Sequence, residues 1–266
     1  SNVAKCRLAD CLGGAEAVYK ADKTLLISTN MVGEECADKI IADRKATDPE
    51  RLYFEFKDSG IQLITRSMTH FPERLRNIGT APYGLFVIGR LPESYDKCVA
   101  MVGARSCSEY GRKAAMDIAA ELAARGYIIV SGLALGIDVA SHRGALRSDG
   151  VSVAVLGCGV DKCYPRGNIT TYMELQRKGA IVSEFYPGTE PMAYNFPTRN
   201  RIISALANQV IIVEARERSG SLITADFALS QVRDVYALPG RIDDALSYGC
   251  NKLIDQGANI ITSVED

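Results

Sequence analysis

Histidine is scarce in this sequence, and its cysteines lack the spacing of a metal site. The chain of 266 residues holds two histidines, His70 and His142, and none of its eight cysteines forms a Cys-x-x-Cys pair. Zinc sites use mainly these two residue types at short spacing, so we expect no metal site. Because no secretion signal precedes the cysteines, we interpret them as buried free thiols rather than disulfides.

Long apolar runs and an excess of positive charge are also missing. No run approaches the roughly 18 apolar residues of a membrane-spanning helix, and residues 1–30 have no basic stretch followed by an apolar one. We therefore expect a cytoplasmic protein without membrane contacts. With 31 Lys and Arg against 32 Asp and Glu, the net charge is −1. Overall charge thus argues against nucleic-acid binding but leaves a local basic groove open.

The common nucleotide-binding loops are absent as well. The sequence has no Gly-x4-Gly-Lys-Ser/Thr loop, and no Gly-x-Gly-x-x-Gly follows the first strand of the main sheet. A nucleophile flanked by a base is not apparent either. We expect no cofactor and no catalytic turnover.

From residue 99 onward, short β-rich runs alternate with helical runs of ten to fifteen residues. The runs are apolar on both faces, which is typical of buried parallel strands. The alternation predicts an α/β fold with a doubly wound, mostly parallel sheet. We expect its strands at residues 99–103, 127–132, 151–157, 180–184, 209–215 and 235–240, with a further strand at 84–91.

The first hundred residues have a different character. Short helical segments joined by glycine turns predict a small helical domain at residues 1–46, which we expect to be shortened at its start. Residues 47–97 extend the second domain, which therefore spans 47–266. The segment "LYFEFKDSGIQLITRS" is typical of a helix that leads into a strand.

Polar residues follow the predicted strands at their carboxyl ends, where open parallel sheets bind ligands. Helix entrances there also attract phosphate through unpaired amide groups. The candidate phosphate-binding residues are Gly103, Arg105, Ser106, Ser131, Gly132, Gly136, Arg166, Asn168, Arg199, Asn200, Arg201, Ser219, Gly220, Ser221 and Thr224.

Each candidate also has a plain structural explanation. The glycines can serve turns, and the serines can cap helices. The arginines can pair with Glu184 or Glu214, Asp138 can interact with a helix dipole, and His142 fits a packed histidine. The conjunction of all these residues on one edge, rather than any single one, favours a row of phosphates as the ligand.

The motifs "VGARSCSEYG", "VSGLALGIDVASHRGAL", "AVLGCGVDKCYPRGN", "FPTRNRIISAL" and "VEARERSGSLITADFAL" occur in the order and spacing of the DprA/Smf family. The chain resembles these DNA-processing proteins of bacterial transformation over about residues 70–265. The resemblance implies an extended Rossmann fold, a homodimer and binding of single-stranded DNA. It also implies a role in competence and recombination, in which the protein protects incoming DNA and delivers it to RecA by displacing or bypassing single-strand-binding protein. The first residues resemble a sterile-alpha-motif-like or helix-hairpin-helix-like domain.

The resemblance also assigns roles. It implies that Arg105 and Arg166 grip phosphates and that the Arg199–Arg201 and Ser219–Thr224 segments contact the strand. One departure is Leu135, which stands where the family usually has a basic residue. By position, the candidates for base stacking are Tyr164, Phe185, Tyr186 and Phe196, and we expect core packing rather than stacking for at least two of them.

An enzyme is the alternative class. Lysine-decarboxylase-like nucleoside-monophosphate phosphoribohydrolases share such a fold, but their Pro-Gly-Gly-x-Gly-Thr-x-x-Glu signature is replaced here by "ARERSGSLITAD". A hydrolase of this kind would have to use Glu214 or Asp226, the only acids nearby.

Overall fold

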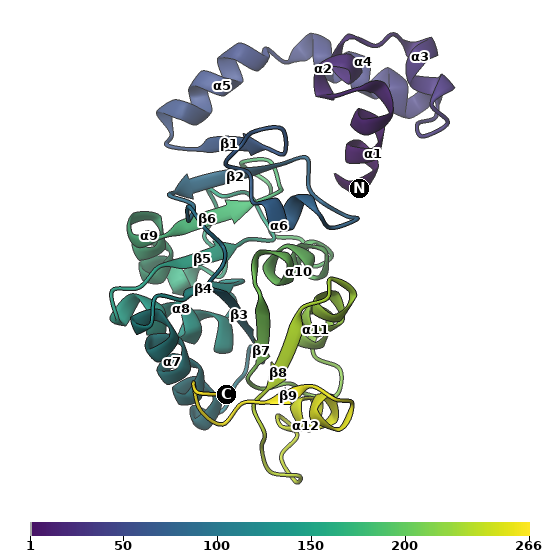
Figure 1. The fold of residues 1–266 in the computed structure, drawn as a ribbon. Helices are drawn as coiled ribbons and strands as arrows, with labels where there is room; N and C mark the ends of the chain where they lie inside the picture. The colour runs from purple at the N-terminus through teal and green to yellow at the C-terminus, as the bar shows by residue number, and fades with distance from the viewer. Residues whose placement is uncertain (1) are drawn as a thin grey trace.

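The structure, a computed structural model, describes residues 2–266 and is built around one mixed sheet (Figure 1). Within this range the sheet has nine strands in the order β1-β2-β6-β5-β4-β3-β7-β8-β9. The pairs β1–β2 and β2–β6 are antiparallel, and the other pairs are parallel. The strands are β1 (Gln62–Thr65), β2 (Gly84–Gly89), β3 (Cys98–Val102), β4 (Ile128–Ser131), β5 (Ser152–Val155), β6 (Ala180–Ser183), β7 (Gln209–Ile212), β8 (Asp234–Ala237) and β9 (Asn259–Ile260).

The predicted α/β fold with a mostly parallel sheet is confirmed. All seven predicted strands are present, and most of them end two or three residues earlier than expected. The residues beyond each strand end still belong to apolar runs, but they turn into the loops that carry the polar candidates. The short edge strand β9 was not predicted, because two exposed residues show no apolar pattern.

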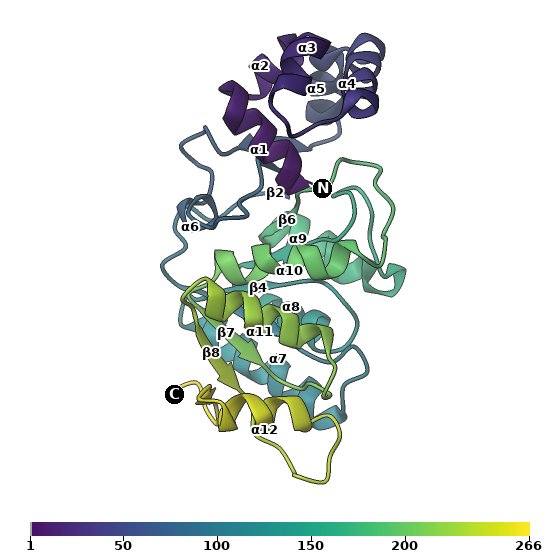
Figure 2. The same cartoon turned by 90° about the vertical axis from the view of Figure 1, so that its right-hand side faces the viewer.

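Helices cover both faces of the sheet. Figure 1 shows α7 (Glu109–Ala124), α8 (Ile137–Arg147) and α9 (Ile169–Lys178) on one face. The opposite face carries α10 (Asn195–Leu206), α11 (Gly220–Ser230) and α12 (Tyr248–Asp255), which Figure 2 views from the front. Separate apolar clusters fill the two interfaces. None of the helices within residues 2–266 combines the length and hydropathy that crossing a bilayer requires.

The chain reverses its direction of winding at β3. From β3 the connections run outward through β4, β5 and β6, and the chain then returns to place β7 on the other side of β3. The loops after β3 and β7 therefore diverge to opposite faces and leave a crevice between them. This crevice is where the sheet topology favours a ligand.

The first helices form a cluster of their own at the β1 end of the sheet (Figure 1). They are α1 (Asn2–Leu12), α2 (Ala15–Lys20), α3 (Lys23–Ser28) and α4 (Glu34–Ala46), and they share a small core of Leu8, Ala21, Leu26 and Ala37. Asp10 forms an ion pair with Arg66, and the Tyr83 hydroxyl accepts a hydrogen bond from the Ala15 amide at 3.0 Å. The division into domains at residue 46 stays a prediction.

The connection to the sheet runs through α5 (Pro49–Asp58), and the short α6 (Glu73–Arg76) lies between β1 and β2 in the chain. Asp48 caps α5 by accepting the amide hydrogens of Glu50 and Arg51, and proline suits the first helical position. Phe56 then packs edge-on against Phe86 of β2, with ring centroids 5.5 Å apart.

The eight cysteines, all of which the structure describes, are free, as expected. Cys6, Cys98, Cys158 and Cys250 are buried, and burial raises the pKa of the Cys98 and Cys250 thiols to about 12. The expectation of burial was wrong for two of the remaining four, because Cys11 and Cys36 are exposed on the helical cluster.

Candidate nucleic-acid interface

The crevice between the ends of β3 and β7 is a pocket of about 640 Å³, which we call the arginine pocket. The loop after β3, the start of α8, helix α10 and the loop between β7 and α11 all contribute to its wall. The lining includes Gly103, Arg105, Ser106, Ala134, Asp138, Tyr164, Pro191, Phe196, Pro197, Arg199, Asn200, Arg216, Arg218, Ser219, Gly220, Ser221 and Thr224. Nine of the fifteen predicted site residues therefore meet in one place.

The charge of the arginine pocket is strongly positive. Among the described residues that line it, four are arginines, namely Arg105, Arg199, Arg216 and Arg218, and one is acidic, Asp138. Asp138 is buried, and burial raises its pKa, while the nearby Arg199 charge and backbone amides act in the opposite direction. A protein of net charge −1 thus concentrates positive charge at one crevice, which suits an anionic ligand.

Helix α11 points its N-terminus at the pocket. Ser219 caps the helix by accepting the Ser221 amide hydrogen at 3.3 Å, and the two serine hydroxyls lie 2.7 Å apart. The side-chain amide of Asn200 donates to the Gly220 carbonyl at 3.2 Å and so joins α10 to this helix end. Unpaired amides and the helix dipole make such an end a phosphate site.

Two aromatic rings form one side of the pocket. Tyr164 and Phe196 stack with centroids 5.6 Å apart and an interplanar angle of 29°, and the Arg105 guanidinium lies 5.2 Å from the Phe196 centroid. This arrangement offers a planar surface to a nucleobase. The other two aromatic candidates lie elsewhere: Phe185 does not line the pocket, and Tyr186 packs against Phe56 and Phe86.

Arg199 lines the pocket but is only 3% exposed. Its guanidinium donates to the Gly132 carbonyl at 2.9 Å and to the Val155 carbonyl, and its Nε donates to Asn200 at 3.1 Å. Burial lowers the pKa of Arg199 to about 10. A Cβ atom on Gly132 would lie 2.6 Å from the guanidinium, so this glycine makes room for Arg199.

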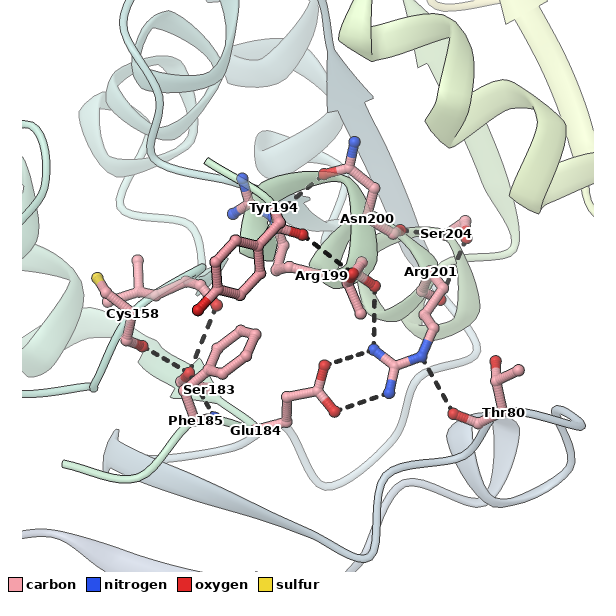
Figure 3. Close-up of polar contacts among 12 residues, drawn as sticks. Thr80, Cys158, Ser183, Glu184, Phe185, Tyr194, Arg199, Asn200, Arg201 and Ser204 are labelled. Carbon is pink, nitrogen blue, oxygen red and sulfur yellow. Dashed lines mark hydrogen bonds and ion pairs between the residues drawn. The ribbon is translucent and has the colours of Figure 1, made fainter. Parts of the chain in front are cut away.

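Arg201 has a structural role, in place of the expected contact with phosphate. It is 2% exposed, and its guanidinium donates to both carboxylate oxygens of Glu184 at 2.6 and 2.7 Å (Figure 3). Further bonds reach the carbonyls of Thr80 at 3.1 Å and Thr198 at 3.0 Å. Figure 3 shows this buried fork joining α10 to the end of β6 and to the loop before β2. The pairing with Glu184 is the alternative that the sequence left open.

Three more predicted residues are also buried outside the arginine pocket. Ser131 donates to the Met101 carbonyl at 2.6 Å between two strands. Asn168 donates to the Leu133 carbonyl at 2.9 Å and so fixes the loop after β4. Gly136 has a φ of +77°, and a Cβ atom there would lie 2.2 Å from the Ala104 carbonyl oxygen. Their contacts shape the loops and leave them no direct access to a ligand.

Arg166 is exposed and lines a second hollow of about 530 Å³. This hollow shares Tyr164 and Pro191 with the arginine pocket, so the two lie next to each other. Leu135, which is 50% exposed, lies in a smaller hollow with Arg105, Tyr164 and Phe196. The exposed candidates therefore form a strip from Arg166 to the start of α11.

Arg216 and Arg218 are the site residues that sequence reasoning missed. Both are exposed and line the pocket just before the Ser219 cap. The alternating charges of Arg-Glu-Arg in "ARERSGS" are typical of an ordinary solvated turn. The only signal that could have identified these arginines as site residues is their position between a strand end and a helix cap.

Of the two acids considered for a hydrolase, Glu214 is hydrogen-bonded within the protein and Asp226 does not line the pocket. The carboxylate of Glu214 is buried and accepts hydrogen bonds from the Ser108 amide at 2.8 Å and from the Ser108 hydroxyl, which places it at the start of α7. Asp226 is exposed and does not line the pocket. No group of three or more potential metal ligands was found among the described residues.

His142 is a packed histidine, as its helical position suggested. It is fully buried, its Nδ1 lies 2.7 Å from the Ser152 hydroxyl, and burial lowers its pKa to about 3. The imidazole is therefore neutral and belongs to the packing between α8 and β5.

Comparison with known proteins identifies the family of this chain. A family model described as DNA recombination-mediator protein A matches residues 62–266. The chain belongs to this family. A relative, the DNA processing protein DprA of Streptococcus pneumoniae, is 43% identical over 196 residues, which make up 74% of this chain and 69% of that protein.

Solved structures of the family have the same fold. The X-ray structure of DprA from Streptococcus pneumoniae matches with a TM-score of 0.85 at 33% identity and covers 100% of this chain and 91% of that one. A DprA structure from Helicobacter pylori, described for its single-stranded DNA binding mode, matches with a TM-score of 0.68 at 29% identity over 77% of this chain and 93% of that one.

Substitution of a buried arginine and of an exposed arginine should have different effects on the free energy of unfolding. Removing one partner of a buried ion pair leaves an uncompensated charge, so Arg201→Ala should lower the free energy of unfolding by about 3–5 kcal/mol. Arg105→Ala, at an exposed position, should change it by less than about 0.5 kcal/mol. Urea unfolding followed by circular dichroism measures both, with Glu184→Gln as a milder disruption of the same pair. An Arg201→Ala protein as stable as the parent would contradict the structural role.

Proposed function

We propose that this chain binds single-stranded DNA along the strip from Arg166 across Tyr164 and Phe196 to the start of α11. The observation that carries the proposal is the arginine pocket, in which several exposed guanidiniums surround the N-terminus of a helix at the sheet's switch point. Family membership and the DNA-binding mode ascribed to the Helicobacter pylori relative support it.

The proposed contacts divide by chemistry. Phosphates lie against Arg105, Arg166, Arg216, Arg218 and the α11 N-terminus, because forked donors and amide groups bind anionic oxygens well. Bases lie against the exposed face of the Tyr164–Phe196 stack, which is sequence-tolerant because every base has a π-face. A duplex hides its base faces, so the strip favours single strands with little sequence preference.

The chain's role is that of a recombination mediator without catalytic turnover. It holds the strand through binding free energy alone and delivers it to RecA past single-strand-binding protein, which requires a RecA-facing surface outside the arginine pocket. A homodimer places two strips on one particle and raises avidity for a continuous strand. These partners follow from the family and remain proposals for this chain.

Loss of a phosphate contact should change the salt dependence of binding. Each of Arg105→Ala and Arg218→Ala should weaken single-strand binding and make the slope of log K against log salt shallower by about 0.7. Fluorescence anisotropy with a labelled oligonucleotide measures both quantities. Arg90→Ala is the matched control, since this exposed arginine pairs with Glu93 outside the strip. Slopes equal to the parent's in both strip variants, or equal affinity for duplex and single strands, would refute the proposal.

A cation added at Leu135 should have the opposite effect. This side chain is half-exposed beside Arg105 and Tyr164, so Leu135→Arg should strengthen binding and steepen the salt slope by about 0.7. Leu135→Met keeps the apolar character and serves as the control. If the arginine variant keeps the parent's slope, the loop after β4 does not touch the strand.

The mediator role needs its own measurement. The chain should stimulate RecA filament formation on single strands coated with single-strand-binding protein, and light scattering should report a dimer. The Arg105→Ala/Arg166→Ala double variant should lose the stimulation because it cannot hold the strand. Stimulation that survives in this variant, or a monomer at micromolar concentration, would overturn the mechanism.

A further inference from the structure

Thr224 is a buried side chain with an unused donor. It lies in the second turn of α11, is 1% exposed, and still lines the arginine pocket. Its hydroxyl has no hydrogen-bond partner among the described residues. A polar group buried in this way is unfavourable unless something bonds to it, so the position calls for an explanation.

The usual partner of this hydroxyl is already occupied. A threonine inside a helix commonly donates to the carbonyl four residues earlier, which is Gly220 for Thr224. That carbonyl instead accepts the side-chain amide of Asn200 at 3.2 Å. The contact from α10 thus leaves the Thr224 hydroxyl without its usual acceptor, in a residue that lines the pocket.

Other hydrogen-bond donors line the same pocket as Thr224. The Ser219 and Ser221 hydroxyls lie 2.7 Å apart at the start of α11, and Arg216 and Arg218 belong to the loop just before that helix. A group bound there needs several acceptor oxygens on one centre. A phosphomonoester has three such oxygens and carries about −1.5 to −2 charges at neutral pH, whereas an internal phosphodiester keeps two and must continue into a sugar on both sides.

We propose that the α11 cradle, formed by Ser219, Ser221 and Thr224 with Arg216 and Arg218, binds a terminal phosphomonoester. A phosphorylated strand end therefore enters the pocket to Thr224, while internal phosphates lie along the strip above. A free nucleoside monophosphate presents the same group and occupies the same cradle. The inference rests on the proposed single-strand binding and adds recognition of the strand end.

The experiment compares oligonucleotides that differ only at their ends. Anisotropy is measured for one sequence with hydroxyl ends, with a 5′-phosphate and with a 3′-phosphate, each labelled internally. At least one phosphorylated end should bind about fivefold more tightly than the hydroxyl form, and thymidine monophosphate should compete more effectively than thymidine. Equal affinity of all three oligonucleotides would overturn the inference.

Substitutions at Thr224 test the hydroxyl itself. Thr224→Val keeps the shape and should bring the ratio of affinities for phosphorylated and hydroxyl ends close to one, whereas Thr224→Ser should retain it. Ser230→Ala, which removes an exposed hydroxyl from the far end of α11, is the control. Because the lost hydroxyl has no protein partner, Thr224→Val should melt no lower than the parent. A valine variant that melts lower and keeps the ratio would make Thr224 purely structural.

The two proposals fail in different ways. Absence of binding to the hydroxyl-ended strand refutes the proposed function, and calorimetry with thymidine monophosphate still tests the cradle. Binding of the hydroxyl-ended strand without an effect of either end phosphate leaves the proposed function intact and refutes the cradle alone.

Discussion

The guanidinium of Arg199 extends from α10 to carbonyl oxygens at the ends of two neighbouring strands, β4 and β5. It thereby joins α10 to two strand ends that lie far from it in the chain, and its guanidinium also lies 6.0 Å from the Phe196 ring centroid. Removing a guanidinium from water is expensive, and the carbonyl acceptors and the nearby Asp138 compensate for it. This buried cation therefore contacts the backbone at two strand ends and the aromatic side of the pocket, and position 132 has room for it because it is a glycine.

The arginines of the site consequently divide into two classes with different physics. Arg199 and Arg201 are buried, satisfied by protein groups, and hold the loops and α10 in place. Arg105, Arg166, Arg216 and Arg218 are exposed and line the two hollows. The arginines of the site thus include buried residues that stabilise the fold and exposed residues on the surface. Only the exposed ones are accessible to the proposed DNA ligand.

The sequence predicted the architecture well because its signals are local. Runs that are apolar on both faces produced the central strands, and the strand ends located the pocket, since parallel topology brings those ends to one edge. The distinction between Arg201 and Arg105 was out of reach, because it depends on Glu184, seventeen positions earlier in the chain, folding against α10. Likewise, Arg216 and Arg218 were hidden by an alternation of charge that any exposed turn can show, and the free hydroxyl of Thr224 depends on where Asn200 donates.

Glu214 has a consequence for how fast a strand can be captured. Its carboxylate holds Ser108 at the start of α7, and its carbonyl oxygen accepts the Ala104 amide at 2.8 Å, so the loops on both sides of the crevice are fastened to each other. Neither wall has to be ordered when a ligand arrives, which keeps the entropic cost of association low. For the proposed single-strand binding, this rigidity implies that capture is governed by diffusion in the local positive field and falls with ionic strength. The lifetime of such a complex is then set by how many contacts must break together.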